Sequence, residues 1–292
     1  MKRGKSRRLF KKKKLHSNQR LGCIIAIIVL IPICYGLYLY YQQYSVQHSS
    51  KPQIETSVSL PTPSGKDLEI PISLIPRQEQ IIRHKGYTVS YNKDLKIPNW
   101  VSYELTRQET KGKEKRGDNF IADPLVKGAI ATNADYARSG YDKGHMAPAA
   151  DMKWSPDVMK ESFYFSNMCP QHPQLNRRGW KNLEEKIRDW AVADSAIIII
   201  CGPIIDKPSK TIGKNKVAVP ERFFKVILSP FVKPARGIGF LFNNRQAVEP
   251  LSTYAVSIDS IEKLTHMDFF SPLPDEIENA VEANADYYQW PR

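Results

Sequence analysis

An uninterrupted apolar run, Ala196–Ile200, restricts the fold of this 292-residue chain more than any other stretch. Its residues carry no polar side chain, and Cys201-Gly202-Pro203 follows directly. Such a short run, rich in β-branched residues, is typical of a strand buried on both faces at the centre of a sheet. The sequence therefore predicts a sheet with a core on each face, and a central strand that stops at Cys201-Gly202-Pro203.

Other stretches have the periodicity of strands and helices. Tyr87–Tyr91 and Trp100–Leu105 alternate with a period of two, as half-buried strands do, with a turn at 94–98 between them. Further strands are expected at 163–168, 223–228 and 238–242, and helices at 156–162, 176–191, 258–264 and 275–284. About 210 residues organised in this way fit one mixed α/β domain with a substantial core.

A basic block and an apolar block precede this domain. Residues 1–20 hold ten Lys and Arg and no acid, and residues 21–41 are uncharged. Removing those ten charges from the net charge of +13 leaves +3 for the rest, so membrane orientation explains the excess better than a nucleic-acid surface does. Roughly twenty apolar residues cross a bilayer as a helix. We therefore expect a single-pass membrane protein with residues 1–20 in the cytoplasm and the domain on the periplasmic or extracellular side.

A cleaved signal peptide is the alternative for this segment. It is less favoured, because the apolar run is longer than a typical signal-peptide core and no small-x-small cleavage site follows it. Residues 42–80 are rich in Gln, Ser and Pro, a composition that buries little apolar surface. The sequence thus predicts a flexible linker at 42–80 and a domain at 81–292.

A compact group of functional side chains lies at Asp142-Lys143-Gly144-His145. It places an acid, a base, a glycine and an imidazole in succession, ahead of a small segment stiffened by Pro148. Taken alone, His145 is as consistent with a structural histidine as with a catalytic one. The residues that follow decide between these interpretations.

The pattern continues with Asn176, Trp180, Leu183, Glu184 and Arg188. Over most of residues 87–270, the chain resembles the DNA/RNA non-specific endonucleases, the ββα-metal family that includes endonuclease G. The signature of that family is Asp-Arg-Gly-His, followed about thirty residues later by an Asn that opens a helix carrying Trp, Leu, Glu and Arg. The resemblance implies a ββα-metal nuclease fold, with a central, mainly antiparallel sheet flanked by helices.

The resemblance and the needs of phosphodiester hydrolysis imply roles for four residues. His145 is the expected general base, because an imidazole of near-neutral pKa accepts a proton at working pH. Asn176 is the expected direct ligand of a hard divalent ion, most simply Mg²⁺, with Mn²⁺ as an alternative. Glu184 would orient the ion's waters, and Arg188 would clamp the phosphate near the leaving group. An ordinary i,i+4 ion pair is the alternative for Glu184 and Arg188.

Four more residues complete the expected site. Asp142 is the expected orienting partner within the motif. Lys143 stands where the family has Arg; it keeps the positive charge but lacks the planar fork that grips phosphate. Arg116 matches a phosphate-contacting arginine of the family, although a charged loop at 111–116 also fits a solvated surface. Asn167 is expected to be a structural amide rather than a ligand.

Two classes of function remain. The first is a membrane-anchored, metal-dependent nuclease that cuts DNA and RNA with little sequence preference, because phosphate contacts carry no base information. The second is a catalytically impaired module that binds nucleic acid or acts as a scaffold.

A conventional zinc site is not expected, since the six His and four Cys lack paired ligand spacing. Cys169 and Cys201 are expected to be separate buried thiols, with a disulfide as the alternative.

Overall fold

The computed structural model describes residues 54–55, 68–206 and 209–291. The basic block at 1–20, the membrane helix expected at 21–41 and most of the linker expected at 42–80 lie outside these residues. Within the described part of the chain, no helix is long and apolar enough to cross a membrane. The described residues all belong to one compact unit.

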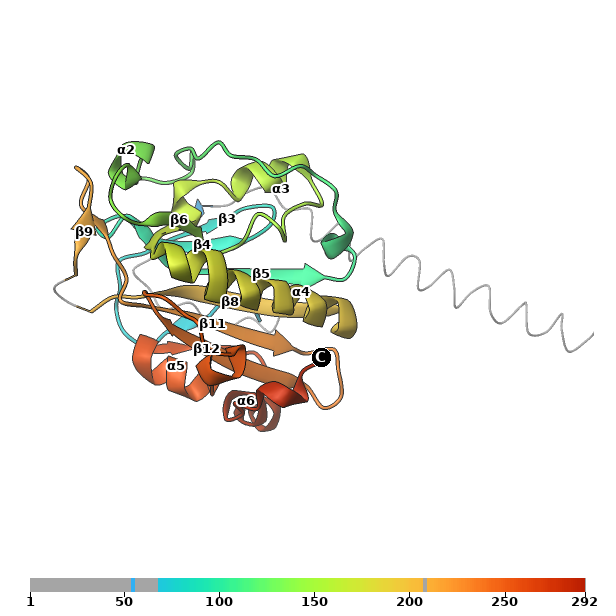
Figure 1. Cartoon of the computed structure of the whole chain (residues 1–292). Coiled ribbons are helices and arrows are strands. Elements are labelled where there is room, and N and C mark those ends of the chain that lie inside the picture. Colours follow the sequence, from blue (N-terminus) through green and yellow to red (C-terminus); the bar gives the residue numbers. More distant parts are fainter. Residues whose placement is uncertain (1–53, 56–67, 207–208, 292) are drawn as a thin grey trace, which may run out of the picture. The chain divides into compact units, whose positions relative to one another are not determined.

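Eight strands of the described chain form one antiparallel sheet, in the order β1-β3-β4-β5-β8-β11-β12-β13 (Figure 1). They are β1 (Ile54–Glu55), β3 (Gln80–Arg83), β4 (Thr88–Asn92), β5 (Ile97–Thr106), β8 (Ala196–Ile204), β11 (Arg222–Ser229), β12 (Arg236–Asn243) and β13 (Ala255–Val256). β8 pairs with β5 on one side and with β11 on the other. The apolar run is therefore an interior strand, and the expected mixed fold with a mainly antiparallel sheet is confirmed.

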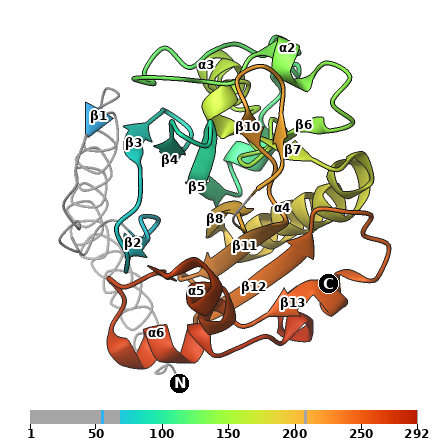
Figure 2. The ribbon, with the colours of Figure 1, turned by 90° about the vertical axis from the view of Figure 1, so that its left-hand side faces the viewer.

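The alternation of β8 divides its side chains between two cores. Ile197 and Ile199 belong to the core under α4 (Lys181–Asp194), whereas Ile198 and Ile200 belong to the core under α5 (Ile258–Thr265) and α6 (Asp275–Glu282). Successive strand residues point to opposite faces, so an all-apolar strand feeds both cores. Figure 2 shows α4 separated from α5 and α6, with β11 and β12 between them.

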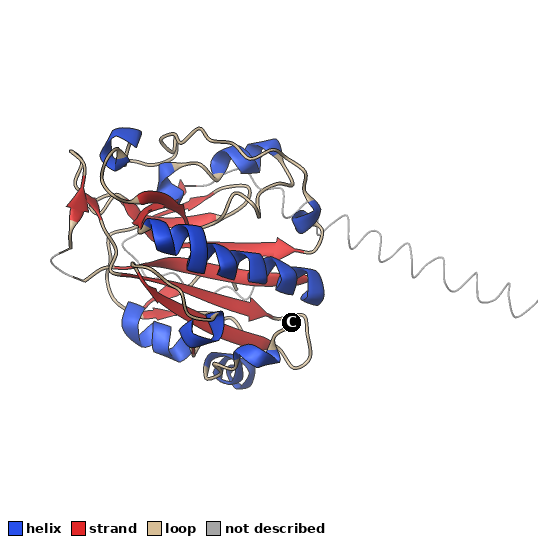
Figure 3. Ribbon diagram, in the orientation of Figure 1, coloured by secondary structure: helices blue, strands red, loops and turns tan. Residues whose placement is uncertain are grey.

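Shorter elements complete the fold (Figure 3). Three two-stranded pairs join β2 (Ile72–Ser73) to β14 (Met267–Asp268), β6 (Asp142–His145) to β7 (Met168–Gln171), and β9 (Thr211–Ile212) to β10 (Val217–Ala218). The remaining α-helices are α2 (Asn133–Tyr136) and α3 (Pro156–Glu161). Short turns of 3₁₀ helix occupy Glu109–Lys111, Phe165–Asn167, Leu251–Tyr254 and Tyr287–Gln289.

The motif strand β6, its partner β7 and the helix α4 form a ββα unit, with α3 and a 3₁₀ turn in the connection between the two strands. β6 and β7 are antiparallel, with Gly144 opposite Cys169. A Cβ on Gly144 would lie 2.6 Å from Cβ of Gln171, so glycine lets the two strands approach this closely. After β7, the chain enters a π-helical segment, Leu175–Trp180, that runs directly into α4. Asn176 thus opens the helix within an irregular first turn, which is common at functional sites.

Two local expectations differ from the structure. The strand expected at 163–168 is a 3₁₀ turn at Phe165–Asn167, and the strand begins only at Met168. The central strand does not stop at Gly202 and Pro203 but continues to Ile204. Its pairing with β5 ends at Cys201, while the pairing with β11 continues. Pro203 is tolerated because it lies where β8 has a partner strand on one side only.

Residues 68–80, expected to be part of a flexible linker, are instead part of the folded unit. β2 pairs with β14, and Leu68 and Ile70 pack against the second core. Arg77 donates to the main-chain carbonyl of Thr265 at 2.9 Å. The polar composition of the whole 42–80 stretch conceals this apolar portion near its end, so the domain starts before residue 81.

Both described cysteines are free and buried. Cys169 lies on β7 and Cys201 on β8, and the Cys201 thiol donates to the main-chain carbonyl of Met146 at 3.2 Å. Burial raises the pKa of the Cys201 thiol to about 11. The structure therefore contains two separate thiols rather than the disulfide.

Candidate active site

His145 ends β6 and lies in an aromatic pocket. Its ring packs edge-on against Phe163, with centroids 5.0 Å apart, and at 5.5 Å from the ring of Phe120. The residue is only 7 % exposed, and Nε2 has no hydrogen-bond partner among the described residues. Trp180 Nε1 donates to the main-chain carbonyl of His145 at 3.3 Å, which ties the motif strand to the start of α4.

The pocket keeps this imidazole neutral. Burial, with the positive charge of Arg116 as the second cause, lowers the pKa of His145 to about 3. A lone pair on the ring is therefore available throughout the neutral range. A protonated imidazole, by contrast, has no lone pair to accept a proton.

Asp142 and Asn176 are hydrogen-bonded to each other. Nδ2 of Asn176 donates to Oδ2 of Asp142 at 3.0 Å. Arg177 makes a bidentate pair with the same carboxylate, at 2.8 and 2.7 Å. Although burial opposes ionisation, these donors lower the pKa of Asp142 below its usual value. The structure thus places Asp142 against Asn176 and Arg177, not against the imidazole.

The direction of this hydrogen bond fixes the amide of Asn176. An ionised carboxylate only accepts, so the amide nitrogen must face Asp142 and the carbonyl oxygen must face away from it. A carbonyl oxygen is a ligand that hard divalent ions accept. The donor set around Asn176 therefore fits a Mg²⁺ ion held by one neutral oxygen, with remaining positions filled by water and substrate.

Arg188 is paired with a different acid from the one its spacing suggests. Its Nη1 donates to Oδ1 of Asp151 at 2.8 Å, and Tyr103 donates to the other oxygen at 2.9 Å. The Asp151 side chain is fully buried, whereas that of Arg188 is 22 % exposed. The expected alternative, a Glu184–Arg188 ion pair, is not formed. Asp151 instead holds the guanidinium by one edge and leaves its partly exposed portion toward solvent.

Glu184 lies on α4 with a perturbed carboxyl group. Burial raises its pKa to about 7, and the charge of Asp151 adds to this, while Lys225, Arg188 and Arg116 oppose it. Lys225 is the largest opposing influence, and it is itself fully buried on β11. Its Nζ has no hydrogen-bond partner among the described residues and lies 4.5 Å from the ring of Trp180.

Two further cations lie on the aromatic walls of the histidine pocket. Nζ of Lys143 is 4.2 Å from the ring centroid of Phe120 and donates to Oδ1 of Asn133 at 2.9 Å. The guanidinium carbon of Arg116 is 5.4 Å from the ring of Phe163. Each cation thus packs on a ring that also contacts His145, so both expected phosphate-contacting residues lie beside the imidazole.

Asn167 is a fully engaged structural amide. Its Oδ1 accepts from the main-chain nitrogen of Ala147 at 2.9 Å. Its Nδ2 donates to the carbonyls of Ala147 and Ser162 at 2.8 and 2.9 Å. The side chain is fully buried, and these three bonds hold the segment after His145 in place.

Comparison with known proteins agrees with this geometry. The model of the DNA/RNA non-specific endonuclease family matches residues 64–276. A nuclease from a Nostoc species is 30 % identical over 250 residues, which cover 80 % of this chain and 88 % of the relative. This chain belongs to the DNA/RNA non-specific endonuclease family. It is a nuclease by that membership.

Mitochondrial endonuclease G of Homo sapiens is another similar protein of the endonuclease class. It is 33 % identical over 213 residues, which cover 67 % of this chain and 71 % of that protein. A crystal structure of the EndoG/EndoGI complex, which concerns EndoG inhibition, superposes with a TM-score of 0.63 at 29 % identity. The superposition covers 66 % of this chain and 86 % of that one, so the fold is shared as well as the sequence.

Several residues of this endonuclease site were not expected from the sequence. Lys225 interrupts an otherwise apolar stretch, residues 223–228, within β11, and a charge at an inward position was a usable signal. Asp151 lies in the segment after the motif, but its pairing with Tyr103 and Arg188 joins three distant stretches of chain. Sequence spacing contains no trace of that long-range contact.

Proposed function

We propose that this endonuclease hydrolyses phosphodiester bonds of both DNA and RNA, with His145 as the general base and Asn176 as the direct protein ligand of Mg²⁺. The observation that carries the proposal is the fixed amide of Asn176, bonded at 3.0 Å to the first residue of the motif strand that ends in a buried, neutral His145. Mn²⁺ would bind the same oxygen donor.

His145 supplies the proton acceptor in this proposal. Its lowered pKa makes it a weak base in the free enzyme, but the imidazole is fully deprotonated at neutral pH. A phosphate entering beside it brings negative charge, which favours the imidazolium and raises its proton affinity as the reaction proceeds. The attacking water would therefore lose its proton to a histidine whose walls, Phe120 and Phe163, exclude competing solvent.

Asn176 and Glu184 would hold the ion. Asn176 would offer its carbonyl oxygen, and Glu184, a partly buried residue of α4, would bind the ion's hydration shell. When bound, the ion would neutralise charge on the phosphate oxygens and stabilise the leaving oxygen. Opposite charge nearby also lowers the pKa of a carboxyl group, so Glu184 would be ionised in the loaded enzyme.

Arg188, Lys143 and Arg116 would contact the phosphate backbone. Arg188 has one edge fixed by Asp151 and its other donors partly exposed, which suits a positioned clamp. A hollow lined by Tyr141, Lys210, Glu221, Asn244 and Arg245, among others, adjoins the start of β6 and would offer two further cations to the backbone. Such contacts carry no base information, which accounts for activity on DNA and RNA alike.

A nuclease assay on the full chain tests this function. The protein should degrade plasmid DNA and RNA with Mg²⁺ or Mn²⁺ and should stop in EDTA. The alternative is a catalytically impaired module that binds nucleic acid or acts as a scaffold. Retention of nucleic acid without cleavage in every divalent metal would establish that alternative.

We further propose that residues 21–41 anchor the enzyme in a membrane, with the N-terminus in the cytoplasm and the catalytic domain on the periplasmic or extracellular side. The support is the ten-cation block followed by an uncharged apolar span in the sequence. Protease added outside intact cells, after permeabilisation of any outer envelope, should remove the domain and leave a protected N-terminal fragment. Full protection of the domain would overturn the orientation, and a mature protein starting near residue 42 would indicate a signal peptide.

A further inference from the structure

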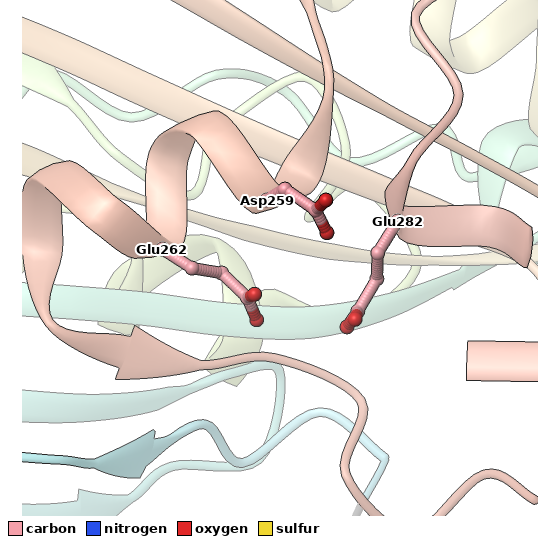
Figure 4. Close-up of side chains that lie close together, drawn as sticks. All are labelled: Asp259, Glu262 and Glu282. Atoms are coloured by element: carbon pink, nitrogen blue, oxygen red, sulfur yellow. The ribbon is translucent and has the colours of Figure 1, made fainter. Parts of the chain in front are cut away.

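Five carboxylates gather on the sheet face opposite the catalytic helix α4. Asp259 and Glu262 come from α5, Asp268 from β14, and Glu278 and Glu282 from α6. One oxygen each of Asp259, Glu262 and Glu282 lie within 4.8 Å of one another, and the same holds for Asp268, Glu278 and Glu282. Figure 4 shows Asp259, Glu262 and Glu282 pointing toward a common space. Glu282 is the member shared by both groups.

Glu282 is the observation that makes this cluster more than a group of surface acids. The residue is only 7 % exposed, and its Oε1 is buried without a hydrogen-bond partner among the described residues. The side chain points into the space between Asp259 and Glu262 (Figure 4). A buried carboxylate oxygen without a hydrogen-bond donor destabilises the native fold. A bound cation or a proton on this oxygen would remove that cost.

The surroundings of Glu282 increase the free-energy cost of burying its carboxylate. It is the last residue of α6, where the helix dipole is negative, and it lies four residues after Glu278. No Lys or Arg of the described chain forms an ion pair with any of the five acids. The guanidinium of Arg77 reaches the C-terminal end of α5, where it donates to Ser73 and to the main-chain carbonyls of Thr265 and His266. Protein groups therefore leave the cluster's negative charge uncompensated.

We propose that Glu282, Asp259 and Glu262 bind a calcium ion that stabilises the packing of α5 and α6 on the sheet, while Asp268 and Glu278, which form the second group with Glu282, add negative charge beside it. All the ligands are oxygens, which excludes soft metals and favours hard cations. Ca²⁺ accepts six to eight oxygens at about 2.3–2.6 Å in irregular arrangements, whereas Mg²⁺ demands a near-ideal octahedron. Oxygen separations up to 4.8 Å place donors on opposite sides of one ion of this size.

Without a cation, the cluster holds protons instead. Burial, reinforced by the neighbouring acids, raises the pKa of Glu282 to about 9 and that of Glu262 to about 7. One oxygen of Glu262 already accepts from the main-chain nitrogen of Phe269 at 2.8 Å, which orients the side chain. Ile258 and Val281, which precede Asp259 and Glu282 in the chain, are buried in the second core, so an ion there would join two helices that pack on it.

The proposed ion is structural and distinct from the ion held by Asn176. α4 and the motif strand pack on the first core, whereas α5 and α6 pack on the second, across the sheet. The proposal does not depend on the catalytic roles of His145 or Asn176. The two sites are therefore separable by substitution.

Calcium titration calorimetry and thermal unfolding test the proposal on the full chain. Asn176→Ala provides a background that removes the proposed catalytic ligand. In that background, about 1 mM Ca²⁺ should raise the Tm by about 4 °C and give a binding isotherm of one site. Adding Glu282→Gln should weaken Ca²⁺ binding at least tenfold and abolish the Ca²⁺-dependent rise in Tm. In EDTA, the Tm of this variant should be equal to or higher than that of the background.

Glu276→Gln is the matched control, because Glu276 is exposed on the same helix and lies outside both groups. It removes one negative charge from α6 and should leave Ca²⁺ binding unchanged. Asp268→Asn, a second variant, removes a negative charge from β14 and should also weaken Ca²⁺ binding. The absence of a Ca²⁺ isotherm, or an unchanged isotherm in Glu282→Gln, would overturn the site. Equal affinity for Mg²⁺ would overturn the assignment to calcium.

Discussion

Asn176 donates to Asp142 at 3.0 Å, and this one contact fixes both the tilt of the amide and the atom it can offer to an ion. The first residue of the motif therefore contacts the proposed metal ligand and not the imidazole three residues later. Partners of this kind set ligand orientation, and their loss weakens metal affinity more than it disturbs the fold.

Replacing Asp142 by Ala should raise the Mg²⁺ concentration that gives half-maximal cleavage by about tenfold or more, because the amide loses its orienting acceptor. Saturating Mg²⁺ should restore most of the rate. Arg177→Ala is the control. It removes a side chain that binds the same carboxylate, but it leaves the hydrogen bond between Asp142 and Asn176 in place. Equal metal dependence in both variants would contradict the orienting role.

Lys143→Arg restores the residue typical of the family. The longer fork should keep its position over Phe120 and add donors for a phosphate, so turnover should be unchanged or higher and the KM for DNA lower. Steady-state kinetics on a defined duplex measures both quantities. A severe loss of kcat would show that the site is organised around lysine and its bond to Asn133.

Lys225→Met removes a buried ammonium that lacks a hydrogen-bond partner. Apolar replacement of buried charge is often neutral or stabilising, so denaturant unfolding at neutral pH should show a stability change of between zero and about +3 kcal/mol. The charge of Lys225 lowers the pKa of Glu184, so its loss should raise that pKa. The acid limb of kcat/KM should then move to higher pH if Glu184 acts as a carboxylate.

Lys214→Met is the matched control for this prediction, because Lys214 is exposed on the loop between β9 and β10. It should alter neither the stability nor the pH profile. A shift of the acid limb to lower pH in Lys225→Met would contradict the proposed influence on Glu184.

Acid sensitivity of the fold should depend on His145. The unfolded chain protonates this histidine below its ordinary pKa of 6.5, whereas burial keeps the native imidazole neutral down to about pH 3. The unfolded state therefore binds more protons in this window, and stability falls as the pH falls through it. Between pH 7.5 and 4.5 the loss due to His145 should be on the order of 2 kcal/mol.

Urea unfolding in EDTA at the two pH values measures this loss. His145→Gln cannot be protonated, so its stability should fall less than that of the wild type over the same interval. An equal loss in His145→Gln and the wild type would contradict a buried neutral imidazole.

The larger elements of the fold could be predicted because their signals are local. An apolar run identified β8, alternation identified β4 and β5, and a three-to-four residue period identified α4. The errors arose where tertiary contacts override composition. Pro203 continues a strand because pairing with β5 has already ended there, and residues 68–80 are ordered by a partner strand almost 200 residues away.

The site divides in the same way. Motif spacing predicted site roles for His145, Asn176, Glu184 and Arg188, since the chemistry restricts which residue types can occupy those places. It could not assign Arg188 to Asp151, or place Lys225 beneath Trp180, because both contacts join separate elements across the core. Burial, and the pKa values that follow from it, also depend on those elements.

The most direct test of the central claim is the Mg²⁺ dependence of DNA cleavage by the wild type, His145→Ala and Asn176→Ala. His145→Ala should lose about 10²-fold or more of the rate at every Mg²⁺ concentration, because it lacks the base but keeps the ligand. Asn176→Ala should regain part of its activity as Mg²⁺ rises. Recovery of His145→Ala by Mg²⁺, or cleavage at the wild-type rate without His145, would contradict the account.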